Sequence, residues 1–516
     1  MRRTIIGLAY LICGGIIAAC LFNSYALDRP AAFAFEQTVN YYYRKGGGFT
    51  QALASWLIHT GISRDWSAND EATPDITRYP VLKSAASALL SYPYQIYRQD
   101  GRPQGQAPGP FLPPAKSRIV NVASMKDMAN AISGARPGDI ITVQPGSYNF
   151  EGPYLPVQVA GAAHLPIYLR ADQFGSVELN FDSLEGFLVM APYWVFENLR
   201  IRGTCVQHGS CEHAFHVVGR ARAFTLRNSE IINFNAAIKV NMQPIQGKSY
   251  YPDDGLVEYN SFFNETPRKT GNPVTLININ AADRWVVRGN FIADFAKTGA
   301  DQTSYAAFMK GNGRGGIFER NLVICEHRLP ANGGIRVGLS FGGGGTAAKF
   351  CKKQRCQQEF SNGIMRNNII MHCSRDVGIY LNRASNSEID HNLLYNNLGV
   401  DVRFDTASAR LTNNIISGRI RARANGQSTT AGNHIFRNCL GESRPDCAIA
   451  GVYNDPDRAD FRLKNLDNSL WHEASAASAI EDDFCGRPIP QMVNVGPIQY
   501  LNGLDCITLP QAQSAN

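Results

Sequence analysis

The sequence predicts a single-stranded right-handed parallel β-helix, on three observations: an internal repeat, a turn-rich composition and a helix at the start of the repeat. The 516 residues include 47 glycines, and only 18% of all residues are charged. This composition is typical of a turn-rich β protein. The net charge of +7 is modest for this length, so it permits an acidic partner, and we expect no nucleic-acid partner.

The repeat is a short apolar strand followed by Asn. Its eight asparagines are Asn198, Asn228, Asn260, Asn290, Asn321, Asn368, Asn392 and Asn414. Steps from 22 (414 − 392) to 32 (260 − 228) residues each fit one coil, and the step of 47 (368 − 321) is expected to hold two. Asn tolerates the left-handed conformation of a tight turn, and stacked Asn amides can hydrogen-bond from coil to coil. The segments are too short and too rich in β-branched residues for a helical solenoid.

Residues 1–26 have the features of an export signal. Arg2 and Arg3 precede an apolar run from Ile5 to Phe22. Cleavage after Ala26, lipidation at Cys20 and retention as a membrane anchor all remain open, since the run is near the roughly 20 residues that cross a bilayer. A buried core helix is the alternative. The first three interpretations place the protein outside the cytoplasm, in the periplasm or cell envelope, anchored or secreted.

The remaining chain divides by composition. Residues 27–100 carry helical periodicity and predict a small helical region, and residues 101–117 form a linker rich in Pro and Gly. The β-helix is predicted over 118–430, where Ser124 caps an amphipathic helix that covers the exposed end of the coil stack. In residues 431–516 the repeat fades, and we expect this segment to close the other end.

Ten cysteines follow Cys13 and Cys20. Three pairs lie close in sequence: Cys205/Cys211, Cys351/Cys356 and Cys439/Cys447. These pairs predict local disulfides in an oxidising compartment. A zinc site is the weaker alternative, because no CxxC or His pair accompanies the cysteines at ligand spacing.

Each coil has a second strand after its Asn turn, and the outward residues of these strands predict a polar stripe. Its members, with Arg314 beside them, are Lys239, Asn278, Asn280, Lys310, Arg336, Asn382, Arg383, Arg403 and Arg421. Such positions lie about 4.8 Å apart on successive coils. The cations suit carboxylates or sulfates and the amides suit hydroxyl groups, so the expected partner is an acidic polysaccharide bound to a monomer. A solvated face without a partner is the alternative.

Lys310 and Arg336 are 26 residues apart (336 − 310), about one coil, with Asn321 between them. Lys310 follows Phe308-Met309, and Arg336 lies in Gly333-Gly-Ile-Arg-Val-Gly338. Here residues 118–430 resemble the β-helical polysaccharide lyases of the chondroitinase B and alginate lyase family, in which Gly-x-x-x-Arg-x-Gly follows a strand-borne Lys. This chain keeps Arg-x-Gly but has a glycine two residues before Arg336. The resemblance implies a pectate-lyase-like solenoid that cleaves uronic-acid glycans by β-elimination, with Lys310 as the base and Arg336 at the carboxylate or the leaving oxygen.

One departure from the family pattern, together with the variety of functions on this fold, leaves alternatives open. Calcium-binding members of that family place carboxylates just before the Lys, whereas here only Asp301 is near, so calcium is possible but no ligand set matches. A glycoside hydrolase on this fold would need a carboxylate pair, which the acidic residues of one coil could supply: Asp253, Asp254, Glu258 and Glu265. A uronate epimerase and a non-catalytic polysaccharide-binding or surface protein also fit the fold.

Overall fold

The computed structural model describes residues 117–329, 334–343, 346–436, 448–464, 480–489 and 494–499. The predictions for residues 1–116 and for the pair Cys439/Cys447 lie outside these residues. In the described part of the chain, no helix is long and apolar enough to cross a membrane.

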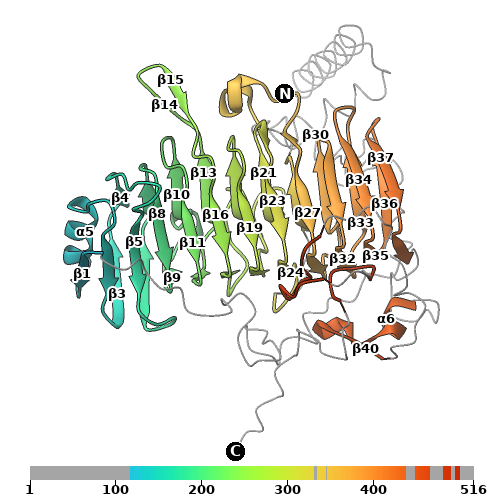
Figure 1. Cartoon of the computed structure of the whole chain (residues 1–516), viewed down its shortest axis with the longest axis horizontal. Coiled ribbons are helices and arrows are strands. Elements are labelled where there is room, and N and C mark those ends of the chain that lie inside the picture. The colour runs from blue at the N-terminus through green and yellow to red at the C-terminus, as the bar shows by residue number, and fades with distance from the viewer. Residues whose placement is uncertain are drawn as a thin grey trace, which may run out of the picture. The chain divides into compact units, whose positions relative to one another are not determined.

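The described strands form three long parallel sheets, and each coil passes through one strand of each (Figure 1). The first sheet contains β1 (Ile119–Val122), β2 (Ile140–Val143), β5 (Ile167–Ala171), β8 (Trp194–Glu197), β11 (Thr225–Arg227), β16 (Leu256–Glu258), β19 (Val286–Arg288), β23 (Ile317–Glu319), β27 (Ile364–Arg366), β31 (Ser387–Asp390), β34 (Ser408–Thr412) and β37 (Gln427–Ala431). The second contains β3 (Gly146–Glu151), β6 (Val177–Asp182), β9 (Arg200–Gly203), β12 (Glu230–Ile232), β17 (Ser261–Phe263), β20 (Phe291–Ala293), β24 (Leu322–Ile324), β28 (Ile369–Met371), β32 (Leu393–Tyr395), β35 (Ile415–Ser417) and β38 (His434–Phe436). The third contains β4 (Leu155–Val157), β7 (Glu185–Val189), β10 (His213–Val218), β13 (Ala236–Asn241), β18 (Val274–Asn280), β21 (Thr303–Lys310), β25 (Ile335–Phe341), β29 (Ile379–Asn382), β33 (Gly399–Arg403) and β36 (Arg419–Arg423). The predicted parallel β-helix is confirmed.

The predicted capping helix is α5 (Met125–Ser133), at the β1 end of the stack (Figure 1). The Ser124 hydroxyl accepts a hydrogen bond from Asp127 N at 3.1 Å and so caps the helix. Met128 and Ile132 are buried and belong to the main core. The helix therefore shields the first coil from water.

The asparagine stack is confirmed for six of the eight predicted residues, and it continues to Asn433 beyond them. It consists of Asn260, Asn290, Asn321, Asn368, Asn392, Asn414 and Asn433, each donating from Nδ2 to the Oδ1 of the next at 2.8–3.1 Å. Asn198 and Asn228 lie one position too early to join it. At the equivalent place Ser229 N donates to Asn260 Oδ1 at 3.0 Å.

Two details of the predicted repeat are wrong. In the stacked coils the left-handed residue is the one before the stacked Asn, for example Tyr259 or Arg320, and only Asn198 and Asn228 adopt that conformation as expected. The step from Asn321 to Asn368 holds one coil, since these two side chains bond directly. Its extra residues form the excursion between β25 and β26 (Phe360–Ser361), with the short 3-10 helices Ala348–Phe350 and Lys352–Gln354.

We expect Asn290→Ala to lower the free energy of unfolding by about 2 kcal/mol or more, because buried donors left without an acceptor cost about 1–3 kcal/mol each. Asn290 Oδ1 accepts from the buried backbone N of Asn260 at 2.9 Å, and Asn290 Nδ2 donates to Val257 O at 3.0 Å, so the substitution breaks both bonds. Urea unfolding measures the loss. The matched control is Asn149→Ala, which removes an exposed amide that accepts a hydrogen bond from Asn180 Nδ2 at 3.2 Å and should change stability by less than about 0.5 kcal/mol. Equal losses in both variants would contradict a role for the stack.

Two disulfides, Cys205–Cys211 and Cys351–Cys356, confirm the predicted close pairs. A third, Cys325–Cys373, joins residues 48 apart in sequence. It links the turns that follow β24 and β28, strands of adjacent coils. Sequence spacing could not indicate this pair, because the excursion lies between its members.

Part of the C-terminal segment covers the outer face of the second sheet. That face is apolar along β20 to β35, and it packs against side chains from α6 (Ala448–Val452) and from the antiparallel pair β39 (Tyr453–Asp455) and β40 (Asp460–Leu463). Asp457 adds hydrogen bonds to His372 and to the Tyr395 hydroxyl, both at 2.8 Å. The described part of this segment thus lies along a sheet face, whereas the expectation was closure of the coil end.

Candidate functional site

Two rows of outward side chains run side by side across the third sheet. In the first row, successive register partners are His216, Lys239, Asn278, Phe308, Ser340, Tyr380, Asp401 and Arg421. The second row, two residues further along each strand, includes the partners Asn280 and Lys310 and the partners Asn382, Arg403 and Arg423. The residues between the rows, such as Val240 and Phe341, belong to the core. The structure therefore gathers seven of the predicted stripe residues on one face: Lys239, Asn278, Asn280, Lys310, Asn382, Arg403 and Arg421.

Arg336 is not one of them. It pairs in register with Ser304, six residues before Lys310, which is about 20 Å along the strand. A Cβ added to Gly338 would lie 2.7 Å from the core atom Ile370 Cγ2, so Gly338 is on the inward face of β25. Arg336, two residues earlier, is on the same face of the strand. Arg336 is only 6% exposed, and its Nη1 lies 3.3 Å from Glu326 Oε1. The expected pairing of Lys310 with Arg336 is wrong, because the sequence spacing between these two residues is shorter than the true register offset between β21 and β25.

Two other predicted arginines lie beside the rows. Arg314, on β22 (Gly313–Arg314), is exposed and pairs with Asp283 at 3.3 Å. Arg383 follows β29 in a left-handed conformation, with its guanidinium 4.3 Å from the centre of the Phe404 ring.

Lys239 lies in the middle of β13. Its Nζ donates to Asn278 Oδ1 on the next strand at 3.0 Å. Burial, reinforced by the positive charge of Lys310, lowers the pKa of Lys239 to about 8. A lysine with this pKa is partly neutral near physiological pH and can accept a proton.

Lys310 is the second lysine of this face, at the end of β21. Its Nζ lies 4.4 Å from the centre of the Phe308 ring, and Gly343 covers it so closely that an added Cβ would lie 3.6 Å from Nζ. Burial lowers the pKa of Lys310, and the negative charge of Glu359 opposes this. The amine forms no hydrogen bond or ion pair with any residue in the described ranges.

A histidine lies next to this pair. His216 Nδ1 is 2.7 Å from Glu185 Oε1, and its Nε2 is 3.2 Å from Asn241 Oδ1. Its ring contacts that of His213 at 5.0 Å, and burial together with the charges of His216 and Lys239 holds the pKa of His213 well below its usual value. The two histidines form the motif His213-x-x-His216, which lies one coil before Lys239.

The excursion after β25 borders the lysines. Phe350 O accepts a hydrogen bond from Asn280 Nδ2 at 3.1 Å. Lys352 anchors the same segment through Asp253 and Asp283, at 2.9 and 2.8 Å. On the other side, the hairpin of β14 (Gln243–Ile245) and β15 (Lys248–Tyr250) projects from the end of β13 (Figure 1).

The carboxylates considered for a hydrolase are engaged in ion pairs. Asp253 pairs with Lys352, Asp254 with Arg284, Glu258 with Arg288 and Glu265 with Arg202, at 2.6–2.9 Å. Glu258 belongs to the first sheet and lies away from the lysine face. These residues do not form a carboxylate pair across the third sheet.

The described residues around the lysines do not supply a set of metal ligands. Asp301, the acid noted before Lys310, pairs with Lys297 at 3.1 Å. Among the residues that the structure describes, no group of three or more His, Cys, Asp or Glu could hold a metal ion.

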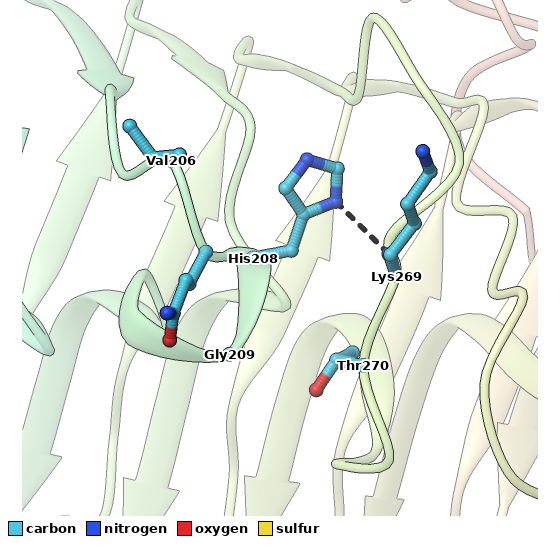
Figure 2. A pocket seen from close by; sticks show the side chains of 6 residues that line it. Val206, His208, Gly209, Lys269 and Thr270 are labelled. Carbon is cyan, nitrogen blue, oxygen red and sulfur yellow. Dashed lines mark hydrogen bonds between the residues drawn. The ribbon is translucent and has the colours of Figure 1, made fainter.

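A surface pocket of about 490 Å³ lies between the turns before β10 and β18 (Figure 2). It is lined by Val206, Gln207, His208, Gly209, Lys269 and Thr270. There Lys269 N donates to His208 Nδ1 at 2.9 Å. No predicted site residue lines it.

No protein-family model and no curated protein matches this chain. Among solved structures it is similar to the pectate lyase Pel9A, with 14% identity and a TM-score of 0.43, covering 75% of this chain and 97% of that one. It is also similar to the PL6 family polysaccharide lyase Pedsa3628 from Pseudopedobacter saltans (14% identity, TM-score 0.32, 67% and 96% covered) and to a rhamnogalacturonan lyase (12%, 0.41, 64% and 89%). The resemblance stays at the level of the fold and assigns no activity to this chain.

Proposed function

We propose that this protein binds an acidic polysaccharide along the third sheet and cleaves it by β-elimination at Lys239 and Lys310. The observation that carries the proposal is the pair of largely buried lysines with lowered pKa values, set among amides on an outward face. Burial of a lysine is unfavourable because its charge loses hydration, whereas a lysine that accepts a proton needs the lowered pKa that burial produces.

The two lysines suit complementary roles. Their mutual repulsion favours a state in which Lys239, with its pKa near 8, is neutral while Lys310 keeps its proton. Neutral Lys239 removes the proton next to the uronate carboxylate, and the Lys310 ammonium, with the Asn280 amide, stabilises the negative charge that develops there. The electron pair then forms the C4–C5 double bond as the C4–O bond breaks, and the departing oxygen takes up a proton.

The compartment follows from the cysteines. Three disulfides among the described residues indicate an oxidising, extracytoplasmic location. We propose that the protein is exported to the cell envelope or beyond, where acidic polysaccharides are found.

Absorbance from new C4–C5 double bonds tests the reaction directly. The full chain is incubated with alginate, pectate and glycosaminoglycans in turn, and we expect absorbance to rise with one of these polymers. New reducing ends without an increase in absorbance would show that the protein hydrolyses the polymer and does not act by β-elimination. Binding without either signal would show that it is a polysaccharide-binding protein.

The activity is expected to increase with pH. The base must be neutral, so kcat/KM should rise as pH passes through about 8 and level off above it, until Lys310 loses its own proton. The measurement is the initial rate between pH 6 and 10 at constant ionic strength. A rate that falls through this range would show that the group with a pKa near 8 acts in its protonated form.

A further inference from the structure

Arginines gather on the same face beyond Lys310, on β33 and β36. Arg403 and Arg423 are direct register partners, and like charges opposite each other on neighbouring strands repel. Asp401 is already held by Arg423, whose Nε and Nη2 donate to it at 3.0 and 2.6 Å. Arg421 Nη2 lies 3.9 Å from the same carboxylate, too far for a hydrogen bond. The buried carboxylate of Asp376 also acts on Arg421 and Arg423. Arg403, Arg421 and Arg423 thus face two carboxylates, and the cluster keeps an excess of positive charge.

Several polar atoms here are buried without a partner. Arg403 Nε and both Nε and Nη2 of Arg421 find no acceptor among the described residues. Burying the N–H group of a cation without an acceptor is unfavourable, so this arrangement indicates a missing anion. The planar guanidinium fork matches carboxylate and sulfate groups.

Asn382 indicates a second chemical group that the ligand must carry. It is 5% exposed and is the register partner of Arg403. Its Nδ2 donates to the Tyr380 hydroxyl at 2.9 Å, while its buried Oδ1 finds no donor within the described part of the chain. A ligand that satisfies this cluster thus carries a hydrogen-bond donor, such as a hydroxyl, as well as an anionic group.

The cluster is also held in place. The Arg403 guanidinium lies 4.7 Å from the centre of the Phe404 ring, against which Arg383 stacks from the neighbouring coil. Stacking on an aromatic ring fixes the plane of a guanidinium and lowers the entropy that binding must remove.

We propose that Arg403, Arg421 and Asn382 form a second subsite that binds one acidic sugar residue, its carboxylate or sulfate on the arginines and a hydroxyl on Asn382. The proposal rests on the polysaccharide of the proposed function. Arg403 is three strands from Lys310, about 14 Å at the usual strand spacing. The subsite therefore holds a sugar away from the bond that is broken, and only chains that span this distance benefit from it.

The test compares the double variant Arg403→Gln/Arg421→Gln with the intact protein, on oligosaccharides of the cleaved polymer that are shorter and longer than this span. For the longer ones we expect KM to rise at least about tenfold with kcat unchanged, as the loss of charge-assisted hydrogen bonds predicts. For the shorter ones kcat/KM should stay the same. The control Arg222→Gln/Arg410→Gln removes the same charge from exposed positions outside the third sheet and should leave KM unchanged.

A loss that is equal for short and long oligosaccharides, an equal loss in the control, or no change at all would each overturn the subsite. If no polymer is cleaved, calorimetric titration with heparin and with polygalacturonate replaces the kinetics. At least about tenfold weaker binding by the double variant, but not by the control, would then support the subsite although the lyase had failed. Equal binding by all three proteins would overturn it.

Discussion

Replacing Lys239 with methionine is expected to lower kcat by about 10²–10⁴-fold, the range that a positioned general base supplies. Methionine keeps the length of the side chain and removes the amine. Because Lys239 donates a single hydrogen bond within the described part of the chain, to Asn278, the fold should survive the change. The measurement is kcat from the absorbance of the unsaturated product, with thermal unfolding of the same preparation to show that the variant is folded.

Arginine substitutions separate the roles of the two lysines. An arginine stays protonated at any working pH, so Lys239→Arg should be as inactive as Lys239→Met. Lys310→Arg keeps the positive charge and should retain more activity than Lys310→Met. The opposite result, an active Lys239→Arg and an inactive Lys310→Arg, would return the role of base to Lys310, the residue that sequence resemblance favours.

The pH profile gives a readout that a purely structural role would not change. The charge of Lys310 helps to lower the pKa of Lys239. Removing that charge in Lys310→Met should raise the pKa of Lys239, so the remaining activity should appear at higher pH than in the unmodified protein. An unshifted profile would mean that the two amines do not interact.

The fold was predictable because its signal repeats. An Asn recurs at about the same turn of eight coils. A pattern repeated eight times can be recognised even where the Asn lies one position away from the stack, as at Asn198 and Asn228. The capping helix was predictable for a different reason, since its cap Ser124 and its apolar side chains are local. Neither inference needed the alignment of one strand with the next.

The site was only partly predictable, because it depends on register. The strands β21 and β25 align Arg336 with Ser304, whereas the sequence spacing of about one coil suggested that Arg336 was a neighbour of Lys310. The sequence placed Lys239 on this outward face as a substrate-binding residue. The lowered pKa on which we propose it as the base comes from burial and from Lys310, which is far from it in the sequence. Sequence spacing carries no information on burial of this kind.

Register also produces a ladder of alternating charges on the outward face of the first sheet. Its successive partners are Arg170, Glu197, Arg227, Glu258, Arg288, Glu319, Arg366 and Asp390. Opposite charges on neighbouring strands favour the observed pairing. If a strand paired with the next but one coil instead of its neighbour, like charges would lie opposite each other. The ladder thus fixes the alignment of the coils that carry the lysines on the third sheet.

Glu197→Gln is expected to lower the free energy of unfolding by about 3–5 kcal/mol, the cost of leaving a buried charge without its partner. The Glu197 side chain is 0% exposed and lies between Arg170 and Arg227, at 2.6 and 2.7 Å. Arg170 keeps an exposed partner, Asp172, which can offset only part of the loss. Urea unfolding at fixed salt measures the change.

The matched control is Glu388→Gln, which removes an exposed carboxylate 3.3 Å from Arg410 on the same sheet and should cost less than about 1 kcal/mol. Replacing Glu197 together with both arginines by apolar residues of similar size should recover much of the stability, because the desolvation of three charges is then avoided. If Glu197→Gln were no more destabilising than Glu388→Gln, the ladder would contribute little to the fold, and the register of the third sheet would have to come from the core and the asparagine stack alone.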